Sequence, residues 1–408
     1  MRMTQSTRSP AATTATEVPS SAETDIEISV VMPCLNEADT LEICIRKAQR
    51  AMKEHSIVGE IIVADNGSTD GSIEIAERCE ARVVHVSERG YGNALMGGIA
   101  AARGKYVLMG DADDSYDFLE TPRFVERLRE GYQLVQGCRL PSGGGTVLPG
   151  AMPFSHRWLG NPMFSWLVRH WFRSPIHDAY CGLRAFTKEF YQRLDLRCTG
   201  MEFATKMIIK AAVHRERTAE VPIKLHPDGR KAHAPHLKTF RDGWRTLRMY
   251  LLYSPRWLFL VPGAGLMLLG LFAAALALPG ATVFGATLDA HTLLFASLFI
   301  LCGYQAILVA VCAKTFAIGE GLLPLDDKMR RLYDVFRLER GLLAGVSMLL
   351  AGTVLLGLAV REWWLADFGA LDYALTMRLV IPGATFAALG FQTFLFSFLI
   401  SLLGLRRK

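Results

Sequence analysis

Apolar residues in the first part of the chain form short runs separated by amphipathic stretches. Short apolar runs that end at a proline, an aspartate or a glycine are typical of buried strands. They occur at 26–33, 60–65, 81–86 and 105–110. Between the first two runs, Leu41, Ile45, Ala48 and Met52 recur at helical spacing. This alternation of strands and helices predicts an α/β domain with a parallel sheet, right-handed crossovers and helices on both faces.

The pattern changes in the second part, where four apolar runs are each long enough to cross a bilayer. They lie at about 257–279, 291–313, 341–361 and 379–404. Lys and Arg gather in the link 314–340 and in the C-terminal Arg406-Arg-Lys408, whereas the links 280–290 and 362–378 are nearly free of them. By the positive-inside rule, the N-terminal domain, the link 314–340 and the C-terminus are cytoplasmic. We therefore expect a multi-pass integral protein of the inner or cell membrane.

A basic amphipathic stretch, 236–255, joins the two parts. Five apolar residues share one stripe at helical spacing, and basic residues flank it. The apolar residues are Leu237, Phe240, Trp244, Leu247 and Leu251, and the basic ones are Lys238, Arg241, Arg245 and Arg248. This composition predicts a helix at the membrane surface; the alternative is a basic helix packed on the N-terminal domain. The domains are then a disordered tail 1–25, an α/β domain 26–235, the interfacial helix 236–255 and a membrane domain 256–408.

Composition and charge indicate which classes of molecule the protein binds. The chain has 408 residues, is 51% hydrophobic and carries a net charge of +6, and its mean hydropathy is +0.22. A basic balance suits an anionic membrane surface or a phosphate-bearing substrate. No module combines aromatic and basic residues as nucleic-acid binders do, so nucleic acid is not an expected partner. The eight cysteines form no CxxC pair, which favours free thiols in a reducing compartment.

Carboxylates follow two of the predicted strands. Asp65 ends the run 60–65, and Asp111-Ala-Asp113 follows the run 105–110. Ligands bind at the carboxyl edge of an open α/β sheet, and side chains two residues apart on extended backbone point the same way. Two such carboxylates suit Mg²⁺ or Mn²⁺ bound together with substrate phosphates; the alternative is a solvated acidic turn. Gly90-Tyr-Gly-Asn lacks the third glycine of a dinucleotide-binding loop, which disfavours a dehydrogenase.

Several motifs in order resemble one enzyme family. They are Val31-Met-Pro-Cys-Leu-Asn-Glu37, Asp65-Asn-Gly-Ser-Thr-Asp70, Asn93-Ala-Leu with Ala102-Arg-Gly104, Asp111-Ala-Asp113, Gly137-Cys-Arg139, Asp178-Ala-Tyr-Cys-Gly-Leu-Arg184, Gly200-Met-Glu-Phe203 and Asp228-Gly-Arg-Lys231. Together, over about residues 26–255, they resemble the inverting glycosyltransferases of family 2, and most closely the dolichyl- or polyprenyl-phosphate sugar synthases. The resemblance implies the Rossmann-like GT-A fold.

The resemblance also implies roles for individual residues. The residues expected to bind the nucleotide sugar are Pro33, Asn36, Glu37, Asp65, Asp111 and Ala112. Asp111 and Asp113 would hold Mg²⁺ or Mn²⁺ against the donor diphosphate. Those expected to meet the acceptor phosphate are Arg139, Arg157 and Arg184, because a guanidinium suits phosphate geometry. For Asp178, Arg184 and Glu202 an internal ion pair is an equally good interpretation. Arg230 and Lys231 would face lipid headgroups or a phosphate.

The sequence thus predicts a membrane-bound, metal-dependent glycosyltransferase with Asp111, Asp113, Arg139 and Arg157 as its catalytic set. It would move a hexose from UDP-glucose or GDP-mannose to polyprenyl phosphate by a single in-line displacement. The acceptor phosphate is largely dianionic at neutral pH and needs no general base. Asp114 and Ser115 stand where mannose synthases of the family often carry a glutamine two places after the second aspartate, which leaves the donor sugar open.

Two other functions remain as alternatives. A processive polysaccharide synthase usually carries Gln-x-x-Arg-Trp before a membrane helix, whereas here Tyr253 precedes Arg256-Trp257 at the glutamine position. A non-enzymatic membrane anchor with a degenerate transferase head is the second, and the intact acidic motifs disfavour it. Whether the protein forms a homo-oligomer is left open by the sequence.

Overall fold

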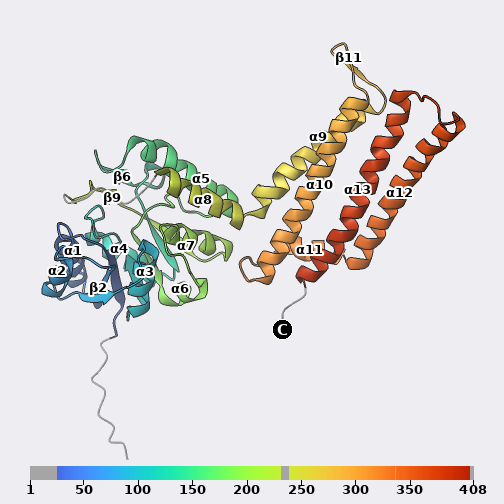
Figure 1. The fold of residues 1–408 in the computed structure, drawn as a ribbon. Helices are drawn as coiled ribbons and strands as arrows, with labels where there is room; N and C mark the ends of the chain where they lie inside the picture. Colours follow the sequence, from blue (N-terminus) through green and yellow to red (C-terminus); the bar gives the residue numbers. More distant parts are fainter. Residues whose placement is uncertain (1–24, 231–238, 336, 405–408) are drawn as a thin grey trace, which may run out of the picture.

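The fold is taken from a computed structural model, which describes residues 25–230, 239–335 and 337–404. Nearly all of the predicted tail, Lys231, the start of the predicted interfacial helix and Arg406-Arg-Lys408 lie outside the described residues. An α/β domain is followed by a bundle of long helices, and helix α8 joins the two (Figure 1).

A seven-stranded sheet forms the centre of the α/β domain. Its strands are β1 Ile28–Cys34, β2 Gly59–Asp65, β3 Arg82–His85, β4 Tyr106–Met109, β5 Leu134–Cys138, β7 Arg184–Thr187 and β8 Thr218–Pro222. The order in the sheet is β3-β2-β1-β4-β7-β5-β8, and only β7 runs antiparallel to its neighbours. The predicted strands agree with the observed ones to within two residues, and the mostly parallel Rossmann-like sheet is confirmed.

Helices cover both faces of the sheet, because strand residues alternate between two cores. Val30 and Met32 of β1 face α1 Leu41–Glu54, α2 Ser72–Arg78 and α4 Thr121–Arg129. Val31 faces the opposite core, which contains α3, α5, α6, α7 and α8. These helices span Tyr91–Ala101, Asn161–Phe172, Lys188–Leu194, Glu202–Val213 and Thr239–Tyr253.

Strand register brings the acidic motifs to one edge of the sheet. Cys34 of β1 is paired with Asp65 of β2, and Val31 is paired with Met109 of β4. The chain leaves β1, β2 and β4 at this same carboxyl edge. The predicted neighbourhood of Asp65 and the Asp111–Asp113 turn is therefore confirmed.

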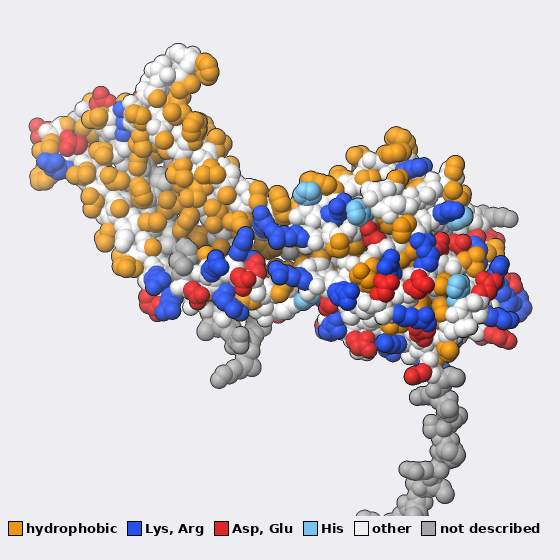
Figure 2. Space-filling view, turned by 180° about the vertical axis from the view of Figure 1, so that it is seen from behind, with side chains coloured by type: hydrophobic (Ala, Val, Ile, Leu, Met, Phe, Trp, Pro, Cys, Tyr) orange, Lys and Arg blue, Asp and Glu red, His pale blue; other side chains and the backbone are white. Residues whose placement is uncertain are grey.

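Among the described residues, four helices are long and apolar enough to span a membrane: Arg256–Ala277, Ala290–Gly319, Leu338–Leu365 and Tyr373–Gly404. The first comprises a π-helical turn and α9 Val261–Ala277, and the others are α10, α12 and α13. The predicted spans fall almost wholly within them, but the later three helices run past the apolar segments into their polar ends. Hydrophobic side chains cover the bundle, and Lys and Arg gather at its end nearer the α/β domain (Figure 2).

Small elements complete the connections between the helices. A short hairpin, β10 Thr282–Val283 and β11 Ala286–Thr287, links α9 to α10, and α11 Asp327–Val335 lies between α10 and α12. The hairpin lies at the far end of the bundle, whereas α11 and the end of α13 lie at the end nearer the α/β domain (Figure 1).

Helix α8 has one face packed on the α/β domain and another face exposed. Thr246, Met249 and Tyr250 are buried against the α/β domain, so one face packs on that domain. Trp244 on the other side is 61% exposed, and Arg245 is exposed as well. The packed face is offset from the predicted apolar stripe, because Tyr250 fits between Phe164 and Phe172 of α5 in edge-to-face contacts.

Candidate active site

The acidic turn after β4 is buried and held in place by its neighbours. The Thr40 hydroxyl donates to the carbonyl oxygen of Ala112 over 2.7 Å. Asp114 has a left-handed backbone, with φ of 59°, and its carboxylate pairs with Lys47 at 2.8 Å. Asp114 therefore faces the cation of α1, which separates its surroundings from those of Asp111 and Asp113.

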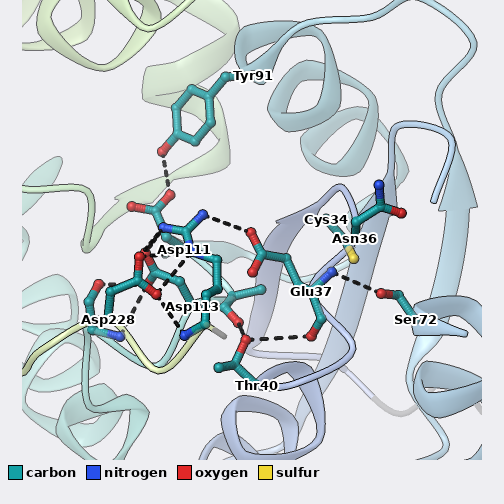
Figure 3. A network of polar contacts seen from close by, with 12 residues as sticks. Cys34, Asn36, Glu37, Thr40, Ser72, Tyr91, Asp111, Asp113 and Asp228 are labelled. Atoms are coloured by element: carbon teal, nitrogen blue, oxygen red, sulfur yellow. Dashed lines mark hydrogen bonds and ion pairs between the residues drawn. The ribbon is translucent and has the colours of Figure 1, made fainter. Parts of the chain in front are cut away.

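Asp111 is a half-buried carboxylate with one strong hydrogen-bond donor. The Tyr91 hydroxyl, at the start of α3, donates to Asp111 Oδ1 over 2.9 Å (Figure 3). Burial, reinforced by the charge of Asp113, raises the pKa of Asp111 to about 6. Burial, together with Asp111, also raises the pKa of Tyr91, so the phenol remains a donor. A carboxylate in this setting is stabilised by an added cation.

Asp113 is bonded on both oxygens. Its Oδ1 accepts from the Ser115 amide over 3.0 Å and the Ser115 hydroxyl over 2.6 Å. Its Oδ2 lies 2.7 Å from Arg230 Nη2. The same guanidinium reaches Glu37 at 3.1 Å and Asp228 at 2.7 Å. Glu37, Asp113 and Asp228 thus gather close together, with Asp111 and Tyr91 beside them (Figure 3).

The pair Asp111 and Asp113 has the chemistry of a divalent-cation site. Carboxylate oxygens are hard ligands, and Mg²⁺ is commonly held by one or two of them while phosphates and waters complete the shell. Within the described ranges, no group of three or more His, Cys, Asp or Glu side chains converges on one metal position.

The predicted nucleoside-binding residues lie at the ends of β1 and β2. Asn36 adopts a left-handed backbone with φ of 61°, and its side-chain oxygen accepts from the Thr69 amide over 2.9 Å. Asp65 accepts from the Gly67 and Ser68 amides, each over 3.0 Å. Although burial acts to raise it, these hydrogen bonds lower the pKa of Asp65, so the carboxylate is ionised. Pro33 is the residue before Cys34, the last residue of β1.

Arg139 lies at the end of β5 in a buried ion pair. Its Nε and Nη2 bind the two oxygens of Asp178 at 2.7 Å and 2.9 Å, and its Nη1 lies 3.4 Å from the Tyr116 hydroxyl. Asp178 is fully buried and Arg139 is 7% exposed. The internal ion pair left open for Asp178 is therefore present, and its partner is Arg139. The edge of Arg139 that faces Tyr116 is the part nearest the acidic turn.

The other two predicted phosphate-binding arginines have different surroundings. Arg184, on β7, is fully buried and donates to the carbonyl oxygens of Cys181 and Ala204. Arg157 lies on a π-helical turn, His156–Gly160, that precedes α5, and its guanidinium lies 5.3 Å from the Trp158 ring. Arg139, Arg157 and Arg184 thus each have different partners in this structure.

A small cavity of about 80 Å³ lies against Asp111. Tyr91, Tyr116 and Tyr180 line it from the α/β domain, and Arg245 and Thr246 line it from α8. Helix α8 leads directly into the first long apolar helix. The candidate site is therefore open toward the element that joins it to the membrane domain.

Two features of this region escaped the sequence analysis. Tyr91 lies in a glycine-rich segment that was expected to open a helix, as α3 does, but no role was assigned to its side chain. The turn before α5 and α5 itself expose apolar side chains on the molecular surface: Phe154, Trp158, Leu159, Met163 and Trp166. Their helical spacing, with Trp158 at 60% and Trp166 at 54% exposure, was a signal for a second surface helix beside α8.

Comparison with known proteins places these features in one family. Residues 29–195 match the glycosyl transferase family 2 model, and residues 311–404 match the model of the glycosyltransferase family 2 C-terminal transmembrane region. The low-salt glycan biosynthesis hexosyltransferase Agl6 of Haloferax volcanii is 35% identical over 395 residues, which cover 94% of this chain and 91% of that protein. A dolichyl-phosphate hexose transferase of the same organism is 29% identical over 48% of this chain and 82% of its own length.

Among solved structures, glucosyl-3-phosphoglycerate synthase from Mycobacterium tuberculosis is 24% identical, with a TM-score of 0.42, over 55% of this chain and 77% of that one. The similarity to Agl6 extends over both the α/β domain and the membrane helices. The acidic turn at the carboxyl edge of the sheet, the four long apolar helices and this similarity agree: the chain belongs to glycosyltransferase family 2.

Proposed function

We propose that this glycosyltransferase moves a hexose from a nucleotide-diphosphate sugar, UDP-glucose or GDP-mannose, to polyprenyl phosphate in the membrane. The observation that carries the proposal is the cavity between Asp111 and α8. It connects a carboxylate suited to a metal–diphosphate complex with the helix that leads into the bilayer. The activities named for Agl6, a hexosyltransferase, and for the dolichyl-phosphate hexose transferase support the same substrate classes.

On this proposal, the carboxyl edge of the sheet binds the donor. Pro33, Asn36, Glu37, Asp65 and Ala112 surround the nucleoside, and Asp111 and Asp113 hold Mg²⁺ or Mn²⁺. The bound cation would stabilise the charge that develops on the departing nucleoside diphosphate. The Tyr91 hydroxyl keeps Asp111 oriented through its 2.9 Å hydrogen bond.

The acceptor would approach from the surface formed by α5 and α8. Exposed tryptophans such as Trp158, Trp166 and Trp244 suit the interface between headgroups and acyl chains. Arg157 beside Trp158 is then at headgroup level, where a guanidinium can bind a phosphate monoester. Arg139 would meet the acceptor phosphate with the edge that Asp178 leaves free, and Arg184 would contribute its buried positive charge.

Transfer then needs no general base, because the acceptor phosphate is already an anion. One of its oxygens attacks the anomeric carbon as the bond to the donor diphosphate breaks, with inversion at that carbon. We further propose that the α/β domain is cytoplasmic, because Lys and Arg gather at the end of the bundle nearer that domain (Figure 2).

A donor screen tests the proposed function. Purified protein is incubated with radiolabelled UDP-glucose or GDP-mannose, polyprenyl phosphate and Mg²⁺ or Mn²⁺, and the lipid product is analysed. We expect one sugar per lipid phosphate from one donor, and loss of transfer on addition of EDTA or in Asp111→Asn. A polymeric product, or near wild-type rates in Asp111→Asn and Asp113→Asn, would contradict the proposal.

A further inference from the structure

Arg230 inserts its guanidinium among carboxylates of the candidate metal site. Nη2 lies 2.7 Å from Asp113 Oδ2, Nη1 lies 3.1 Å from Glu37 Oε1, and Nε lies 2.8 Å from Asp228 Oδ2. Only 12% of the side chain is exposed. Arg230 is thus an internal part of the site, whereas the sequence led us to expect a residue facing lipid headgroups or a phosphate.

Arg230 and a divalent cation compete for the same oxygen of Asp113. Oδ1 already accepts two hydrogen bonds from Ser115, so Oδ2 is the oxygen available for exchange. A cation such as Mg²⁺ binds a carboxylate oxygen at about 2.0–2.1 Å. With Arg230 Nη2 at 2.7 Å from the same oxygen, the two positive charges would repel each other across a single atom. Asp113 therefore binds the cation more weakly while Nη2 stays in place.

Arg230 can release Asp113 without leaving the site. Nε contacts Asp228 and Nη1 contacts Glu37, so two partners remain that do not depend on Nη2. The backbone is fixed as well, because the Gly229 amide donates to the Asp113 carbonyl oxygen over 3.0 Å. A Cβ on Gly229 would come within 2.9 Å of Thr40, so this close approach of the two segments requires glycine. Only the guanidinium has to turn. It then stays next to Asp113 Oδ2, where a bound diphosphate would share the cation with this carboxylate.

We propose that Arg230 keeps the divalent cation off Asp113 until a nucleoside diphosphate arrives, and then pairs with that diphosphate. The inference rests on the proposed function, because it assumes a metal–diphosphate donor complex at Asp111 and Asp113. Arg230 is a positioning residue in this scheme. The diphosphate supplies the anion that draws the guanidinium from Asp113, and the cation takes its place, so metal and donor bind together.

The test measures Mn²⁺ binding to the full-length, detergent-purified protein by electron paramagnetic resonance. Without nucleotide, we expect Arg230→Gln to bind Mn²⁺ about tenfold to a hundredfold more tightly than wild type, because the competing charge is gone. A purely structural role for Arg230 would instead predict weaker binding. UDP and GDP serve as the diphosphate probes; the one that binds should tighten Mn²⁺ binding strongly in wild type and much less in Arg230→Gln.

Lys47→Gln is the matched control, because it removes one positive charge of α1 that pairs with the same acidic turn. Lys47 pairs with Asp114 and Asp117, so Mn²⁺ affinity without nucleotide should rise by less than about threefold through the remaining long-range charge effect. Arg230→Lys keeps a cation and should stay closer to wild type than Arg230→Gln.

The outcomes separate the two proposals. Equal Mn²⁺ affinities for Arg230→Gln and Lys47→Gln, with Mn²⁺ and nucleotide still binding together, would overturn the role of Arg230 alone. If neither wild type nor any variant binds Mn²⁺ with UDP or GDP present, the metal-dependent function fails, and the inference fails with it.

Discussion

At the scale of single residues, the site combines charges that the folded chain holds close together at some cost. Asp111 is half-buried beside Asp113, and desolvation acts with that neighbouring charge to raise its pKa to about 6. Arg230 offsets part of the negative charge through Asp113. A divalent cation would offset more, so the proposed metal would relieve the repulsion between the same carboxylates.

This cost predicts a pH-dependent stability difference for Asp111→Asn. The pKa of Asp111 rises from its ordinary value of 3.8 to about 6 in the folded protein. Between these pH values the folded protein keeps a proton that the unfolded chain releases, so wild-type stability falls as pH rises through this window. Asparagine does not titrate and can still accept from Tyr91. In EDTA and above pH 6, Asp111→Asn should have a higher Tm than wild type. The corresponding gain in unfolding free energy is at most about 3 kcal/mol.

The pH dependence distinguishes a charge-based cost at Asp111 from a change in side-chain packing. Below about pH 3 the wild-type carboxyl is largely protonated in both states, so the Tm advantage of Asp111→Asn should shrink toward pH 4 and disappear below it. A Tm difference that is the same at pH 4 and pH 7.5 would contradict a charge-based cost. Thermal unfolding in detergent, followed by intrinsic fluorescence across this pH range, measures it.

Sequence reasoning predicted the neighbours of the acidic residues, but not the ion-pair partners of the basic ones. Asp65, Asp111 and Asp113 follow strands, and strand ends in a parallel sheet meet at one edge, so their positions could be predicted from local pattern. Arg139 and Arg230 make their ion pairs with Asp178, Glu37 and Asp113 across long stretches of chain. Such pairings depend on tertiary packing, which residue spacing does not encode.

At the scale of elements, the strands could be predicted from local pattern, whereas the packing of the surface helices could not. Strand and membrane-helix positions followed from apolar runs. The packed face of α8 did not, because it is set by the aromatic residues of α5 that surround Tyr250. The apolar exposure of α5 itself became evident only when Trp158 and Trp166 were seen outside the core.

Helices α12 and α13 pack through glycines, which gives a prediction at this scale. A Cβ on Gly352 of α12 would lie within 2.6 Å of the Gly383 carbonyl oxygen of α13. Close backbone approach of this kind stabilises helix pairs in membranes, where small residues allow tight packing. Gly352→Val should force the two helices apart and lower the Tm of the purified protein, with an overpacking cost of about 1–3 kcal/mol.

Gly357 of the same helix provides the control, since a Cβ there meets nothing within 4 Å. Gly357→Val changes the same residue type in the same helix and should leave the Tm almost unchanged. Equal losses in the two variants would mean that backbone flexibility, rather than the contact with α13, determines the effect.

At the scale of the whole molecule, the number of spans and the charge distribution predict on which side of the membrane the candidate active site lies. Four apolar helices return the chain to the side on which the first begins. The hairpin of β10 and β11 lies at the opposite end of the bundle from α11 (Figure 1). Active site, link 314–340 and C-terminus should then all lie on the side where nucleotide sugars are made, and only the two short links should face outward.

Cysteine labelling tests this orientation in intact cells. Phe284 lies in the hairpin and is fully exposed, and Glu320 is exposed just after α10. A membrane-impermeant maleimide should label Phe284→Cys in intact cells, because that link faces outward by the positive-inside rule. Glu320→Cys should be labelled only after permeabilisation, and the wild-type chain with its eight native cysteines sets the background. The reverse pattern would place the active site outside the cell, where a cytoplasmic nucleotide sugar could not reach Asp111 and Asp113.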